Sequence, residues 1–170
     1  NVGGFVGKLY NYDNTKPTAV NGKVIANTEI TAEKEAAGGL IGRSFIKTGL
    51  TTAPALDINS VVKGAVTVNA GKVEADYGWA GGLIGNIAQG STGIGGQDAP
   101  VTVVVGSLNT AYCGGGLVGE NYDELAIKGV EDGVVTITIN DWKNTQAPSW
   151  FITHTMQNYC GTFANAVGKG

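Results

Sequence analysis

A short glycine motif recurs along the chain and constrains its fold more than any other feature of the sequence. The motif reads Gly-Gly-apolar-apolar-Gly, and its four clear copies begin at Gly3, Gly38, Gly81 and Gly115. A degenerate fifth copy begins at Gly161, and successive copies are 35, 43, 34 and 46 residues apart. A short strand between glycines gives one or two apolar side chains to a core and lets the backbone bend sharply at each end. The repeat therefore predicts a stack of equivalent units whose motifs pile into one apolar column.

A second element, in which Val or Ile alternates with Thr or Asn, lies between the glycine motifs. Its copies occupy residues 22–26, 65–69, 101–105 and 134–139. Alternation with a period of two is the signature of a half-buried β-strand. Each repeat is therefore expected to contribute this strand to a sheet that is shared with the other repeats.

A third short segment follows in three repeats, at residues 29–31, 72–75 and 108–110. Three short strands per unit fit one triangular coil better than the four strands of a propeller blade. Only residues 29–37 contain a run of helix formers, and glycine interrupts the other segments. The predicted fold is all-β, a right-handed parallel β-helix (solenoid) of about four to five coils. A β-sandwich or a propeller-like repeat is the alternative.

Two stretches lengthen the basic unit. Residues 48–57 lengthen the second repeat and residues 144–157 the fourth. In a stack both would be insertions at corners, where loops on a rigid scaffold carry function. The glycine-rich residues 90–96 are not expected to bind phosphate, because they lack the Gly-Lys-Ser/Thr ending and no helix is predicted after them.

Composition and charge exclude several partners. The net charge is −3, and the 11 Lys and Arg residues are scattered singly, so no nucleic-acid partner is expected. No apolar stretch approaches the ~20 residues that span a bilayer, so no membrane insertion is expected. The single His154 cannot form a zinc site, and we expect no metal and no cofactor. Residues 1–170 are expected to form one repeat domain, a module of something longer, because Asn1 lies inside a motif without a preceding Met.

The string Gly-Gly-Leu-Ile/Val-Gly, recurring with a Val-Thr-Val strand between copies, resembles the GLUG repeat of bacterial surface and secreted proteins. That family includes adhesin-like chains and the flanking regions of some IgA-cleaving peptidases. The resemblance extends from Gly3 to about Asn165. Because the family has no catalytic residues of its own, the resemblance implies a non-enzymatic structural or adhesive module outside the cell. It would act as a rigid scaffold that presents corner loops to a host glycan or protein.

Two other functions fit a stack of coils. Strand edges at its two ends would be covered by neighbouring modules or by like subunits stacked end to end, so a self-assembling filament subunit is one alternative. A glycan-cleaving β-helix enzyme is the other. Glu120, Asp123 and Glu124 could supply its carboxylates. The other repeats carry Lys, Arg and Asn at the position of Glu120, which favours a solvent-exposed corner loop there.

Aromatic residues in and around the last insertion are the candidate ligand-binding residues: Trp142, Trp150 and Tyr159. Exposed aromatic rings stack on sugars, but large amphipathic side chains equally cover the corner or end of a core. The core role is the stronger expectation. If the protein has a ligand surface, these three residues are its predicted site.

The two cysteines leave two alternatives open. Cys113 lies two residues before Gly115, and Cys160 lies one residue before Gly161. Stacked repeats would bring them near each other, one step out of register. They either form a disulfide bond, which an oxidising setting outside the cell permits, or remain two buried thiols.

Overall fold

The computed structural model describes residues 1–11, 18–20, 27–46, 56–58, 66–90, 92–94, 100–111, 113–121, 125–127, 135–144 and 166–168. This described part of the chain is all-β, with its strands in four sheets and with no helix. All the strand pairings in these sheets are parallel. The predicted run of helix formers, residues 29–37, forms the end of one strand, a bend at residues 33–34 and most of the next strand.

Two sheets, which we name A and B, contain the strands on either side of the glycine motifs. The strands of sheet A are β1 (Val2–Gly3), β5 (Glu35–Gly38), β9 (Gly78–Gly81) and β13 (Cys113–Gly115). The strands of sheet B are β2 (Val6–Asn11), β6 (Ile41–Ile46), β10 (Ile84–Gln89) and β14 (Val118–Asn121).

Two further sheets, C and D, complete the fold. The strands of sheet C are β3 (Thr18–Val20), β7 (Leu56–Ile58), β11 (Thr92–Ile94) and β15 (Leu125–Ile127). The strands of sheet D are β4 (Asn27–Ala32), β8 (Val66–Ala75), β12 (Val101–Thr110), β16 (Val135–Asn144) and β17 (Ala166–Gly168).

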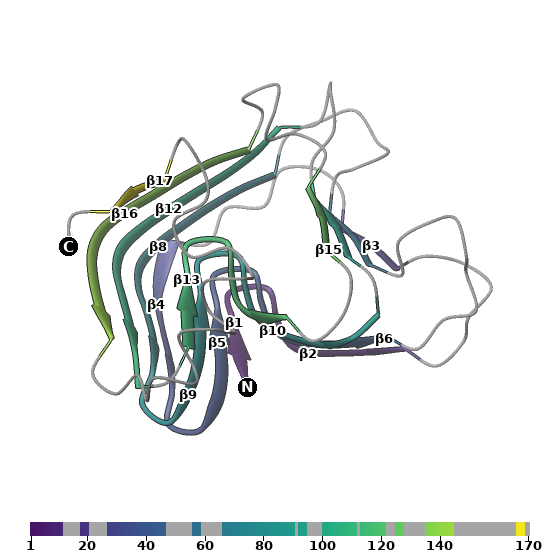
Figure 1. Cartoon of the computed structure of the whole chain (residues 1–170), viewed down its shortest axis with the longest axis horizontal. Coiled ribbons are helices and arrows are strands. Elements are labelled where there is room, and N and C mark those ends of the chain that lie inside the picture. Colours follow the sequence, from purple (N-terminus) through teal and green to yellow (C-terminus); the bar gives the residue numbers. More distant parts are fainter. Residues whose placement is uncertain are drawn as a thin grey trace.

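The chain enters the sheets in the order A, B, C, D four times, and we refer to each round as a pass. Each pass lays one strand beside the equivalent strand of the pass before. Figure 1 shows β8, β12 and β16 curving side by side along one side of the molecule, with β5, β9 and β13 next to them. A pass therefore has four strands, and the prediction of three was wrong because the three-residue strands of sheet C carry too little sequence pattern.

The glycine motif forms the corner between sheets A and B, whereas the sequence predicted a short strand. Gly38 ends β5, Gly39 and Leu40 form a bend, and Ile41 begins β6. Two residues at the bend turn the chain into a different sheet, so the motif is divided between two strands. The flanking glycines thus mark the corner itself.

Successive corners stack on one another through backbone hydrogen bonds. The amide of Leu40 donates to the carbonyl oxygen of Leu83 at 2.8 Å, and the amide of Leu83 donates to that of Leu117 at 2.9 Å. All three leucines are fully buried. The apolar column predicted from the repeat is therefore present.

Two glycines of the third motif are required by close backbone contacts. A Cβ atom on Gly82 would lie 2.1 Å from the carbonyl oxygen of Gly116 and 2.9 Å from Cγ1 of Val103 in sheet D. A Cβ atom on Gly81 would lie 1.8 Å from the carbonyl oxygen of Ile84. Neither position has room for a side chain, so Gly82 lets the corner pack against sheet D and Gly81 lets the chain turn sharply.

The long strands of sheet D combine the second and third elements of the sequence repeat. In β8, Val66, Val68 and Ala70 are buried, then the alternation shifts by one residue before Val73. The shift falls at Gly71, and the corresponding glycine of β12 is Gly106. A Cβ atom on Gly106 would lie 2.4 Å from the carbonyl oxygen of Gly71. The two predicted strands are therefore one strand with an irregular step in its middle.

One hydrophobic core joins strands of all four sheets. Sheet A contributes Ala37 and Ala80 to it. The largest fully buried side chains are Ile30, Leu40, Ile41, Ile46, Leu56, Leu83, Ile84, Ile87, Ile94, Leu108 and Leu117. Strands of all four sheets therefore share one core, to which successive passes contribute side chains.

Several predicted segments fall wholly or partly outside the described residues. Residues 22–26, most of 48–57 and nearly all of 144–157 lie there, as does the fifth motif at 161–165. The end of the first expected insertion is a strand, β7, and residues 92–94 of the glycine-rich stretch form β11. β17 follows the fifth motif at once and joins sheet D, whereas in the other passes sheets B and C come first.

Candidate functional site

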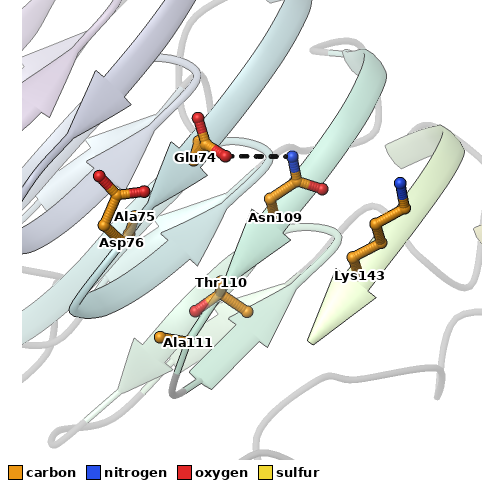
Figure 2. A pocket seen from close by; sticks show the side chains of 7 residues that line it. All are labelled: Glu74, Ala75, Asp76, Asn109, Thr110, Ala111 and Lys143. Atoms are coloured by element: carbon orange, nitrogen blue, oxygen red, sulfur yellow. Dashed lines mark hydrogen bonds between the residues drawn. The ribbon is translucent and has the colours of Figure 1, made fainter. Parts of the chain in front are cut away.

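A row of three polar side chains crosses sheet D near the C-terminal ends of its strands. Glu74 on β8 is in register with Asn109 on β12, which is in register with Lys143 on β16. Adjacent strands lie about 4.8 Å apart, so carboxylate, amide and ammonium are neighbours, as Figure 2 shows. Because side chains alternate along a strand, the row lies on the face opposite the buried Val73 and Leu108.

Two donors hold the Glu74 carboxylate. Nζ of Lys72 lies 2.5 Å from Oε2 of Glu74, and Nδ2 of Asn109 donates to Oε1 at 3.4 Å. The hydrogen bond from Lys72 is the main cause that lowers the pKa of Glu74, against the opposing effect of burial. The same hydrogen bond raises the pKa of Lys72. Both groups are therefore charged at neutral pH, and the carboxylate is fixed in place.

A pocket of about 280 Å³ lies beside this row. Besides the three residues of the row it is lined by Ala75, Asp76, Thr110 and Ala111. The Thr110 hydroxyl donates to the carbonyl oxygen of Gly78 at 2.9 Å, and the amide of Ala111 donates to that of Ala75 at 3.2 Å. These bonds fix the wall of the pocket, whose volume is near the lower end of the ~300–1,000 Å³ typical of small-molecule sites.

The pocket offers both donors and acceptors to a ligand. Oδ1 of Asn109 is buried without a hydrogen-bond partner among the described residues, and Figure 2 shows it directed toward the Lys143 side. The Lys143 side chain is 66% exposed, with its Nζ 3.6 Å from Oδ2 of Asp141. Asp76, which is exposed, also lines the pocket. The arrangement can therefore form hydrogen bonds of both directions with one ligand.

Within the described ranges, no group of three or more His, Cys, Asp or Glu side chains is placed to hold a metal ion. The same ranges contain no helix with the length and apolar character needed to cross a membrane.

The aromatic site predicted from the sequence falls mostly outside the described residues, where Trp150 and Tyr159 lie. Trp142 belongs to β16, and its backbone is in register with Leu108 and, one strand further, with Val73. Both of these side chains are fully buried. The side chain of Trp142 is not among those described, so its role stays a prediction, at a position that belongs to the core in the two preceding passes.

The cysteine pair is also untested. Cys113 begins β13, where its backbone is in register with Trp79 of the pass before. Cys160 lies outside the described residues. The disulfide bond and the pair of buried thiols both remain predictions.

Glu120 was expected in a solvent-exposed loop, and the structure corrects this. It lies in β14 with 5% exposure and accepts a hydrogen bond from Nδ2 of Asn86 at 2.9 Å. The reason is that β14 extends past the motif to Asn121 and keeps Glu120 beside its partner in sheet B. Asp123 and Glu124 lie outside the described residues.

Sequence reasoning missed the row and its pocket, although a signal was present. Residues 72–75 and 108–110 were recognised as equivalent segments. Extending that alignment to residues 141–144 places Glu74, Asn109 and Lys143 in one column, which the strand register confirms. The charges of the three differ, so no single residue type recurs to draw attention to them.

Comparisons of the chain with protein-family models, with curated proteins and with solved structures returned no match.

Proposed function

We propose that the chain forms a right-handed parallel β-helix and serves as a rigid structural or adhesive module of a bacterial surface protein. The observation that carries the proposal is the strand order: each of four passes adds one strand to sheets A, B, C and D in turn. In such an arrangement each pass buries its apolar residues against its neighbours, so the stack behaves as one stiff body. Parallel strands joined by a crossover follow a right-handed path in about 98% of cases, which supports the handedness.

The surface location and the adhesive role are supported by the resemblance to the GLUG repeat. The module would hold its corner loops at fixed spacing and present them to a host glycan or protein. The regular backbone pairing supports this role, because a rigid scaffold orients loops without ordering them anew on each contact. No catalytic role is proposed, since the repeat family has no catalytic residues of its own.

An adhesion assay tests the proposal. Beads carrying the intact chain should adhere under flow to a surface coated with mucin glycoprotein, and beads carrying Gly82→Val should not, because that substitution disrupts a corner. Gly71→Val is the matched control, since a Cβ atom on Gly71 meets nothing within 4 Å. Equal adhesion of all three proteins would contradict the proposal. Release of reducing sugar from the mucin would instead indicate the glycan-cleaving class.

A self-assembling filament subunit is a second candidate, favoured by one observation. The amide of Phe5 donates to the carbonyl oxygen of Leu40 at 3.0 Å, so Phe5 occupies the first-pass position of the buried leucines. Yet Phe5 is 60% exposed, and Val2 near it is 37% exposed. Another pass of the same kind, supplied by a second copy of the chain, would bury the apolar surface of Phe5 and Val2.

Sedimentation velocity distinguishes a filament subunit from a monomeric spacer. For a filament subunit, the average mass should rise with protein concentration and should rise less in Phe5→Lys. Tyr77→Lys is the control, because Tyr77 is similarly exposed at 65% but belongs to a different part of the chain. A monomer at every concentration would exclude the filament.

A further inference from the structure

The pocket beside Glu74, Asn109 and Lys143 is poorly suited to an ion. A cation meets the Lys143 ammonium in the same space, and both carboxylate oxygens of Glu74 already accept hydrogen bonds. An anion meets the carboxylates of Glu74 and Asp76. The apolar lining consists of two alanines, which is too little for an apolar ligand. The remaining class is a neutral ligand rich in hydrogen-bonding groups.

We propose that this pocket binds a neutral saccharide unit of a glycan. Sugar hydroxyls donate and accept at once, which matches a carboxylate, an amide and an ammonium set side by side. Oδ1 of Asn109 is a buried acceptor whose hydrogen bond is unmade among the described residues, and Asn109 lines the pocket, so a small turn of its amide would let a ligand hydroxyl supply the donor. The Glu74 carboxylate is already held by Lys72 and Asn109, so it needs no reordering on binding.

An aromatic residue directly follows one of the pocket residues in the sequence. Tyr77 follows Asp76, which lines the pocket, in the turn that leads from β8 to β9, and 65% of Tyr77 is exposed. The apolar C–H face of a sugar ring packs well on such a ring. Tyr77 does not line the pocket itself, but its exposed ring could pack on one face of a bound unit whose hydroxyls contact the row of polar residues.

This inference rests on the adhesive role proposed above and names a ligand class and a site for it. The site lies on the strands of sheet D and on the turn after β8, not on the long insertions where the sequence predicted it. Binding there would place glycan contacts along the side of the stack.

Titration of the intact chain with cellotetraose, mannotetraose and chitotetraose tests the inference, followed by calorimetry and by amide chemical shifts. At least one of the three should bind saturably and shift the amides of residues 74–77 and 109–111. Asn109→Leu should weaken that binding at least tenfold, because it removes the buried acceptor and the bond to Glu74. Asn69→Leu is the matched control: the same change on an exposed position of β8 outside the pocket should leave affinity within twofold.

Several outcomes would overturn the inference. One is the absence of binding by all three saccharides at millimolar concentration while the circular dichroism spectrum shows a folded chain. Another is binding that Asn109→Leu and Tyr77→Ala leave unchanged. Binding of calcium chloride alone, lost in Asp76→Asn, would assign the pocket to a cation instead. Adhesion of beads to mucin with no change in Asn109→Leu would leave the module adhesive and place its glycan site elsewhere, which separates this failure from that of the proposed function.

Discussion

At the scale of single residues, the glycines of the chain are not equivalent. Gly82 lies between the carbonyl oxygen of Gly116 and Cγ1 of Val103, so its missing side chain is what allows the corner to approach sheet D. Gly71, in the middle of β8, has nothing within 4 Å of a Cβ position. The same residue type is therefore required by close packing at Gly82, whereas the structure leaves room for a side chain at Gly71.

Gly82→Ala and Gly71→Ala should change the free energy of unfolding in opposite directions. The first should lower the free energy of unfolding by roughly 1–3 kcal/mol or more, because a backbone oxygen would have to move. The second should raise it by about 0.4–1 kcal/mol, because alanine restricts the unfolded chain without a clash. Urea denaturation of both variants checks this. Similar losses in the two would show that the contacts at Gly82 do not decide its identity.

The Glu74 carboxylate should make the stability of the folded chain depend on pH in the acidic range. Its pKa is lowered in the folded chain, chiefly by the hydrogen bond from Lys72, so the stabilisation is present above the ordinary value of 4.5 and is lost as pH falls through the lower folded value. Glu74→Gln should therefore cost about 0.5–1 kcal/mol near pH 7 and progressively less below pH 4.5. Denaturant unfolding from pH 7 to pH 3 measures it. A cost that stays constant with pH would refute the pairing, and Glu33→Gln, in a bend outside the row, is the comparison.

At the scale of elements, the interior strands of sheet D should be the most stable part of the fold. β12 is paired with β8 on one side and β16 on the other, whereas β2 is paired only with β6 among the described residues. Amides of β12 should therefore exchange with deuterium several orders of magnitude more slowly than those of β2. Native-state exchange followed by mass spectrometry tests this. Uniform exchange across both strands would mean that the passes open together.

Sheet D and the motif column were predictable from the sequence, and sheet C was not. Residues 65–69 and 101–105 show a clear alternation because one face packs into the core and the other meets water. The strands of sheet C have three residues each, so no alternation can be recognised in them. The pocket was missed for a different reason: Glu74 and Asn109 are neighbours only through strand register, which a single sequence does not display until its repeats are aligned exactly enough.

At the scale of the whole molecule, one pass should be removable. Deleting residues 81–114 joins Ala80 to Gly115, which is the register partner of Gly81. The shortened chain should keep a β-sheet circular dichroism spectrum and unfold with a smaller denaturant dependence, because less surface is buried. Deleting residues 81–97 is the control: it removes part of a pass, breaks the order of the sheets and should prevent folding. Equal behaviour of the two deletions would mean that the pass is not the folding unit.

One position in sheet B gives the molecule a direction. From the first pass to the fourth it is occupied in register by Lys8, Arg43, Asn86 and Glu120. The series runs from cationic through neutral to anionic side chains. Because all the strands run parallel, no two-fold axis relates the first pass to the fourth. A copy added lengthwise in the same orientation would repeat this order of charges, whereas an inverted copy would reverse it. A fibre of this chain would consequently be polar. Its two ends would differ chemically and would grow at different rates.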